Sequence, residues 1–162
     1  GEIAADVENG GLDLGFYAAP VPGTLRFVPL VKDPMLAVLP PGHPLAREQS
    51  VTADMLRDES FIIYGSNGDA DMICALRQLG IAPKVGHILN DDLAIIAMIA
   101  HGHGVSIMPA LILQALGARV VALPLDPPCY RELGLVTPRL RYSTRDARRF
   151  ADFAVQRLRK DG

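Results

Sequence analysis

The chain has 162 residues, of which 49% are hydrophobic, so it can bury a core and does not have the composition of a disordered protein. Its formal net charge is −2 and its sequence pI is ≈ 6.1, which argues against a nucleic-acid-binding surface with clustered lysine and arginine. No apolar stretch approaches the roughly 20 residues of a membrane-spanning helix, and no secretory signal peptide is recognisable. We therefore expect a soluble chain that by itself contacts neither DNA nor a membrane.

Hydrophobic periodicity predicts strands that alternate with helices through most of the chain. This alternation indicates an α/β fold with substantially parallel sheets. In chain order, we expect helices over residues 2–9, 51–56, 69–79, 92–100 and 111–116, and a terminal helix that begins near Ser143 and Asp146; we expect strands over residues 12–16, 25–31, 35–39, 60–64, 84–89, 105–108, 120–123 and 130–136.

Local sequence features refine these expectations. The sequence Lys32-Asp33-Pro34 is typical of a turn, so the strands on either side of it are expected to be separate. The helix over 92–100 is apolar nearly all round, which predicts that it is buried. Cys74 has apolar neighbours in a helical pattern, which predicts a small core residue. The basic residues between positions 131 and 160 predict a solvated helix face and strand ends.

A metal site was considered for the histidines. His101 and His103 are two residues apart in the sequence His101-Gly102-His103-Gly104, and His43 and His87 lie elsewhere in the chain. Zinc needs a third and fourth ligand in a closed geometry, and the two cysteines do not have metal-site spacing either. The glycines are explained by the end of one helix and the start of the next strand. We therefore expect neither a metal site nor a cofactor.

The sequence Tyr64-Gly65-Ser66-Asn67-Gly68 lies between an expected strand and an expected helix, as a hydrolase nucleophile does. The nucleophile elbow has the pattern Gly-x-Ser-x-Gly, and here Tyr64 takes the place of the first glycine. No histidine lies near Ser66 in the sequence to act as its general base, so we do not predict an enzyme. Ser66 is better explained as a helix cap or a ligand contact.

Several turns that follow buried strands could form a ligand pocket. Such turns present free backbone N–H groups at the crevice beyond the carboxyl end of a strand, where ligands bind in open α/β sheets. Each residue alone is explained by turn or capping chemistry. Together, the residues expected to contact a ligand are Phe16, Tyr17, Ala18, Tyr64, Gly65, Ser66, Asn67, Asn90, Met108 and Pro109.

The sequence Pro40-Pro41-Gly42-His43-Pro44-Leu45-Ala46, directly after a strand, resembles the effector-binding domain of LysR-type bacterial transcriptional regulators. Two further patterns carry the resemblance: a helix followed by Leu12-Asp13-Leu14-Gly15-Phe16, and an apolar helix followed by Gly-x-Gly, an apolar strand and Pro109. The resemblance implies a type 2 periplasmic-binding-protein-like fold, with two α/β lobes joined by hinge strands near Leu36–Pro40 and Ala122–Leu135.

The resemblance also implies how the chain is divided. Residues 1–39 and 130–162 would form the first lobe, and residues 40–129 the second. The family's domain opens with a strand, a helix and a strand that have no counterpart here, so the first lobe is expected to be incomplete at its N-terminus.

The function that the resemblance implies is effector sensing. A small molecule would bind in the cleft between the lobes, at the residues given above, and change how the full-length cytoplasmic regulator binds DNA. DNA contact would require a helix-turn-helix domain that is absent from this chain, and the regulator would self-associate as dimers and tetramers. The alternatives are a periplasmic-type solute-binding protein and a hinged α/β enzyme. The sequence names neither the effector nor the regulated genes.

The charge class of the effector depends on four aspartates. Asp69 and Asp71 lie at the start of one expected helix, and Asp91 and Asp92 at the start of another. Helix N-termini favour small anions, but acidic residues in the first turn satisfy the helix dipole internally. If these carboxylates face the cleft, they favour a neutral, amine-bearing or zwitterionic effector. If they face solvent, no preference follows.

Overall fold

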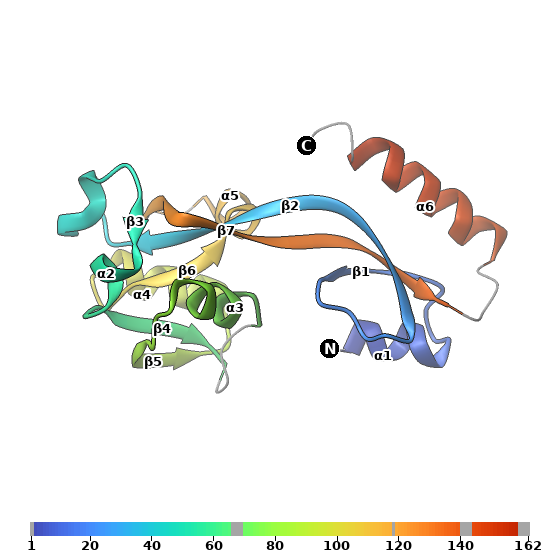
Figure 1. The fold of residues 1–162 in the computed structure, drawn as a ribbon, viewed down its shortest axis with the longest axis horizontal. Helices are drawn as coiled ribbons and strands as arrows, with labels where there is room; N and C mark the ends of the chain where they lie inside the picture. Colours follow the sequence, from blue (N-terminus) through green and yellow to red (C-terminus); the bar gives the residue numbers. More distant parts are fainter. Residues whose placement is uncertain (1, 66–69, 118, 140–143, 159–162) are drawn as a thin grey trace. The chain divides into compact units, whose positions relative to one another are not determined.

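The fold was analysed in a computed structural model, which describes residues 2–65, 70–117, 119–139 and 144–158 (Figure 1). The chain divides into two compact units. Unit 1 consists of residues 1–33 and 131–162, and unit 2 of residues 34–130. The lobe boundaries expected from the sequence, after residues 39 and 129, stay predictions.

Two long strands pass from one unit into the other. They are β2 (Leu25–Leu39) and β7 (Val121–Pro138), which are neighbours in a sheet of order β1-β7-β2-β6 (Figure 1). The sequence predicted two shorter strands in place of each, and this prediction was wrong. In β2, Pro34 precedes the residues that pair with β6, which begin at Met35, so its missing N–H is not needed on that side.

Unit 1 contains α1 (Glu2–Asn9), β1 (Gly15–Ala18) and α6 (Arg145–Leu158), with parts of β2 and β7. Strand β1 pairs antiparallel with β7. Helix α1 buries Ala4 and Val7 in a small cluster with residues of β2 and β7, and α6 buries Ala154 in a second cluster. The Thr144 hydroxyl accepts a hydrogen bond from the Ala147 N–H at 3.3 Å. The cap expected at Ser143 lies outside the described residues.

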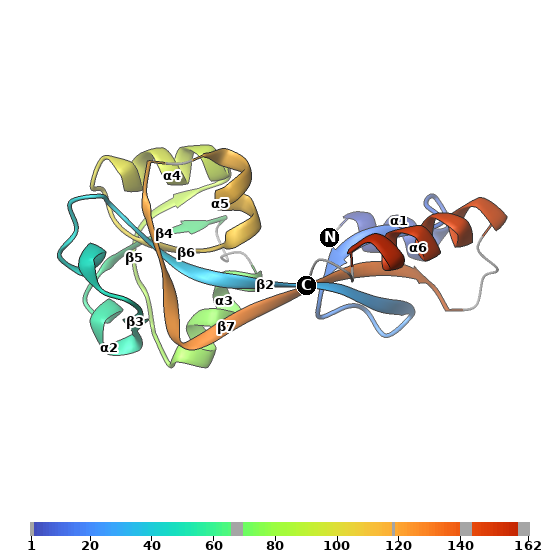
Figure 2. The same cartoon turned by 90° about the horizontal axis from the view of Figure 1, so that it is seen from above.

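Unit 2 contains the larger core. Strand β4 lies in the middle of this core and has a helix layer on each face. Phe61 and Ile63 belong to a buried cluster with residues of α3, and Ile62 between them belongs to a cluster with residues of α4; Figure 2 shows α3 and α4 on opposite sides of β4. This alternation is the period of two that a buried strand requires. The elements of unit 2, besides β2 and β7, are η1 (Pro44–Arg47), β3 (Val51–Thr52), α2 (Ala53–Leu56), β4 (Ser60–Tyr64), α3 (Ala70–Leu79), β5 (Lys84–Leu89), α4 (Asp92–Ala100), β6 (Ser106–Pro109) and α5 (Ala110–Leu116).

The α/β class is confirmed, but the expected parallel pairing holds only in part. Strands β4 and β5 are parallel, as are β3 and β7. The pairs β1–β7 and β2–β6 are antiparallel. Alternation of strands and helices along the sequence fixes the order of the elements, but not the direction in which a strand meets a partner from far along the chain.

Four local predictions are corrected. The strand expected over 12–16 is β1, which begins only at Gly15, and the helix expected over 51–56 opens with the short strand β3. Cys74 is exposed, because Met72, Ala75 and Leu76 form the buried stripe of α3 and position 74 lies off that stripe. In α4, three isoleucines are buried but Leu93 is exposed.

Candidate ligand-binding site

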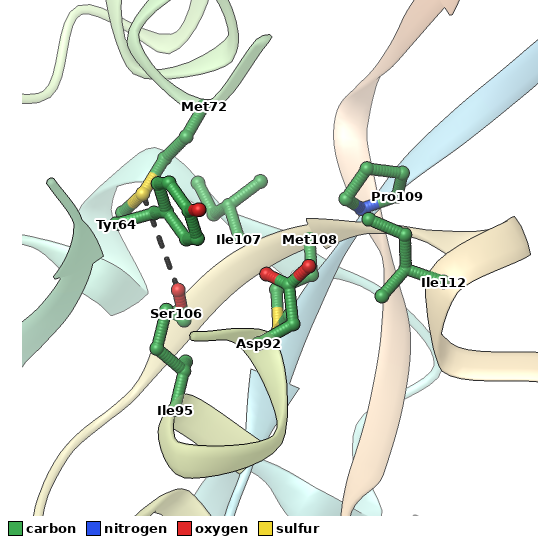
Figure 3. Close-up of a pocket in the computed structure, with 9 residues that line it drawn as sticks. All are labelled: Tyr64, Met72, Asp92, Ile95, Ser106, Ile107, Met108, Pro109 and Ile112. Carbon is green, nitrogen blue, oxygen red and sulfur yellow. Dashed lines mark hydrogen bonds between the residues drawn. The ribbon is translucent and has the colours of Figure 1, made fainter. Parts of the chain in front are cut away.

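Unit 2 holds a cavity of ≈ 210 Å³ at the point where β4 and β6 end and α4 and α5 begin (Figure 3). Its walls are mainly apolar, with a carboxylate, a phenol and a hydroxyl among them. The lining residues are Tyr64, Met72, Asp92, Ile95, Ser106, Ile107, Met108, Pro109 and Ile112.

A second cavity, of ≈ 420 Å³, shares Tyr64, Asp92 and Ile112 with the first. It lies between the start of α4 and the length of α5. Its remaining lining residues are Asn90, Asp91, Leu93, Leu111, Ala115 and Leu116. Because three residues line both spaces, the two cavities adjoin and can receive one ligand. We refer to them together as the unit 2 cavities.

The ends of the strands and helices explain why the chain leaves space here. Gly65 has φ +68°, a conformation that ends β4 directly after Tyr64, and its N–H donates the last bond toward β5, to the Leu89 carbonyl at 2.7 Å. Pro109 ends β6 and is the N-terminal cap residue of α5. Asp91 caps α4, because its carboxylate accepts a hydrogen bond from the Ala94 N–H at 2.8 Å.

Ser106 provides a polar group on the wall of the first cavity. It is only 2% exposed, and its hydroxyl donates to the Ile62 carbonyl at 2.8 Å, with the Met72 sulfur at 4.0 Å (Figure 3). A hydroxyl has one hydrogen and two lone pairs. Since the hydrogen bonds within the protein, Ser106 can offer a ligand only an acceptor.

The charged groups of the unit 2 cavities are acidic. Asp92 lines both cavities and Asp91 lines the second. Figure 3 shows the Asp92 carboxylate and the Tyr64 hydroxyl turned toward the space that the lining residues surround. Among the described residues, no lysine, arginine or histidine lines either cavity.

Four of the residues predicted to contact a ligand line these cavities: Tyr64, Asn90, Met108 and Pro109. Gly65 ends β4 beside them, and Ser66 and Asn67 lie outside the described residues.

Phe16, Tyr17 and Ala18 belong to unit 1. There the Phe16 ring meets Phe150 edge-on at 6.3 Å, and Tyr17 packs against the α1 cluster. Their role as ligand contacts stays a prediction.

Five residues that line the first cavity were not predicted from the sequence as site residues: Met72, Ile95, Ser106, Ile107 and Ile112. Ser106 could have been predicted from the sequence, because it is the one polar residue in the apolar run 105–108. Ile112 follows Pro109 on the first turn of α5, and that spacing could have placed it beside the end of β6.

The histidines have other contacts. The His43 ring accepts the Leu45 N–H at 3.2 Å and lies 3.3 Å from the Glu59 carboxylate, and the His87 and His103 rings are 6.4 Å apart. In the part of the chain that the structure describes, no group of three or more metal-ligating side chains occurs. Gly104 has φ +151°, and a Cβ there would lie 2.5 Å from the Ser60 carbonyl oxygen, so close packing explains this glycine.

Comparison with known proteins identifies the family. The profile of the LysR substrate binding domain matches residues 1–159, so the chain belongs to the LysR substrate-binding domain family. The effector binding domain of QuiR in complex with shikimate is similar in structure, with a TM-score of 0.83, 26% identity, and coverage of 98% of this chain and 78% of that one. The regulatory domain of CcmR from Synechocystis PCC6803, in complex with 2-PG, has a TM-score of 0.85 at 22% identity, over 97% and 78% of the two chains, and shows the shared fold.

The similar curated proteins are transcriptional regulators. One is the HTH-type regulator YnfL of Escherichia coli K12, 27% identical over 98% of this chain and 55% of that protein. Another is the dual regulator GltC of Bacillus subtilis 168, 28% identical over 93% of this chain and 52% of that protein. The chain thus spans about half the length of these relatives. Within the described residues, no helix is long and apolar enough to cross a membrane.

Proposed function

We propose that this chain is the effector-sensing part of a LysR-type transcriptional regulator, and that a small molecule binds in the unit 2 cavities. The observation that carries the proposal is the pair of adjoining cavities at the ends of β4 and β6, in a chain of this family. The complex of the QuiR effector domain with shikimate supports it, because that domain binds a small molecule and is similar over nearly the whole of this chain.

The ligand would act by differential affinity. A ligand that binds one conformation of the chain more tightly than another shifts the population toward the first, without any reaction. DNA binding would belong to a helix-turn-helix domain in the full-length protein, as the name of the YnfL relative indicates for that protein. We further propose that the regulator is cytoplasmic and assembles as dimers or tetramers.

A catalytic role is not proposed. The described residues that line the unit 2 cavities include a hydroxyl and two carboxylates, but no histidine or lysine that could act as a base beside Ser106. The Ser106 hydrogen is already donated to the Ile62 carbonyl, away from a base. A periplasmic-type solute-binding protein is not favoured, because the similar curated proteins are regulators.

The test is a thermal-shift screen of the 162-residue chain against carboxylates, phosphates, sugars, polyols, amines and amino acids. A ligand at saturating concentration should raise Tm in a dose-dependent way, by about 5 °C or more. The change Ile112→Phe adds a ring to a residue that lines both cavities, so it should abolish the shift. The matched control is Ile88→Phe on β5, an exposed residue that lines neither cavity. A ligand that shifts Tm equally in both variants, or the absence of any ligand, would contradict the proposal.

A further inference from the structure

We propose that α6 is a self-association surface, on which two copies of this chain pack their α6 helices antiparallel. Phe150 of one copy would meet Phe153 of the other, and Asp146 of one copy would meet Arg157 of the other. This inference rests on the self-association proposed above, for which it names an interface, and it is independent of the unit 2 cavities.

The exposed side of α6 carries two large aromatic side chains. Phe150 is 46% exposed and Phe153 is 64% exposed, whereas Ala147 and Ala154 on the other side of the helix are buried. Phe16 on β1 meets the Phe150 ring edge-on at 6.3 Å and is itself about half exposed. Three of the five phenylalanines of the chain are therefore exposed in one patch of unit 1, and such a patch is typical of an interaction surface.

The aromatic side chains of α6 belong to a line of residues with opposite charges at its two ends. We call this line the α6 stripe, and it consists of Asp146, Phe150, Phe153 and Arg157. The intervals between them are four, three and four residues, which keeps all of them on one face of a helix. Asp146 lies in the first turn and Arg157 in the last, and both are exposed. Arg149 lies on the flank of the stripe, where its guanidinium can stay in water.

The α6 stripe is complementary to a second copy of itself. When two α6 helices lie antiparallel about a two-fold axis midway between Phe150 and Phe153, the first turn of each helix lies beside the last turn of the other. Asp146 of each copy then faces Arg157 of the other, and the phenylalanines pack between these two ion pairs. A parallel arrangement would place like charges against each other. Charge and apolar contact therefore favour the same antiparallel pair.

A membrane surface fits the α6 stripe less well than a second copy does. Anionic headgroups would attract Arg157 but repel Asp146, and both residues share a face with the phenylalanines. A second α6 in the antiparallel orientation supplies the reversed order of charges that the stripe requires. Because a single pair of helices buries a small area, we expect a weak dimer with a Kd of roughly 0.1 mM.

The experiment is a charge swap followed by sedimentation equilibrium of the 162-residue chain, at concentrations below and above the expected Kd. Asp146→Arg and Arg157→Asp each place like charges against each other in the dimer, and the double variant restores opposite charges in reversed order. Phe153→Ala removes the apolar contact. The matched control is Arg77→Asp, the same change at an exposed arginine in the last turn of α3. Circular dichroism checks that each variant is folded.

Each single charge reversal and Phe153→Ala should weaken dimerisation by roughly 10-fold or more, because two symmetric ion pairs become repulsive or a central ring is lost. The double variant should recover most of the affinity, and Arg77→Asp should leave it unchanged. A dimer that Arg157→Asp does not weaken, or that the double variant does not recover, would overturn this interface while self-association stands. So would a monomeric chain that binds phosphatidylserine vesicles through Phe153. A chain that is monomeric throughout would overturn the inference, while the thermal-shift screen tests the ligand proposal separately.

Discussion

The two units differ in how completely they cover their phenylalanine side chains. In unit 2, Phe61 is 0% exposed, because helices pack on both faces of the strand that carries it. In unit 1, Phe16 and Phe150 are about half exposed and Phe153 on α6 is 64% exposed. The same residue type therefore contributes very differently to the two units. The comparison teaches that the stability of this chain comes mainly from the layered core of unit 2.

The largest expected effect tests this difference directly. The change Phe61→Ala should lower the free energy of unfolding by about 3–5 kcal/mol, because it removes a fully buried ring and leaves a cavity. The matched change Phe153→Ala should alter it by no more than about 0.5 kcal/mol, since most of that ring is already in water. Urea unfolding followed by circular dichroism measures both. Equal losses would contradict the comparison.

For these two ion pairs, burial differs in the opposite direction: the pair in unit 1 is buried and the pair in unit 2 is exposed. In unit 1, Arg131 contacts Asp33 at 2.8 Å, and Asp33 is 1% exposed. In unit 2, the Asp54–Arg57 pair is exposed. Asp33→Ala should cost about 3 kcal/mol, because it removes the carboxylate that compensates a largely buried guanidinium. Asp54→Ala should cost about 0.5 kcal/mol or less. The same unfolding assay decides, and a loss for Asp54→Ala as large as that for Asp33→Ala would refute this contrast.

The smallest expected effect concerns the exposed pair between Lys84 and Asp58. A hydrogen bond from Lys84 at 2.6 Å, together with its charge, lowers the pKa of Asp58 from its ordinary value of 3.8. A lowered folded-state pKa means that the pair stabilises the fold above pH 3.8, and that this contribution is lost as the pH falls through the folded-state pKa. Lys84→Met should return the pKa of Asp58 toward 3.8.

An NMR titration of the Asp58 side-chain carbonyl checks this last prediction, with Asp54 as the internal reference. An unchanged pKa of Asp58 in Lys84→Met would show that the contact does not persist in solution.

Periodicity predicted the elements whose stability is local. Strand β4 and helix α4 have the bounds expected from the sequence, because the apolar run of β4 and the apolar residues and Asp91 cap of α4 lie in or next to the element itself. Strand β5 also has the expected bounds, although nearly all its residues are exposed. The lengths of β2 and β7 could not be predicted in the same way. Their prolines indicate breaks, and only strand neighbours far along the chain show which N–H groups are not needed.

The residues of the candidate site also differ in whether local sequence or long-range packing places them there. Four lining residues were predicted because each ends or directly follows a predicted strand: Tyr64, Asn90, Met108 and Pro109. Met72 and Ile95 were not, since their place at the cavity depends on how α3 and α4 pack against β6. Helical periodicity shows that such residues are buried, but does not show which of them borders an empty space.

The buried ion pair between Asp33 and Arg131 also fixes the alignment of β2 with β7. A slip of one residue along a strand turns every side chain to the opposite face. Such a slip would separate the two charges and leave a buried carboxylate without its guanidinium, at a large cost in free energy. Long strands can pair in several registers of similar hydrophobic content. The ion pair between β2 and β7 selects one of them.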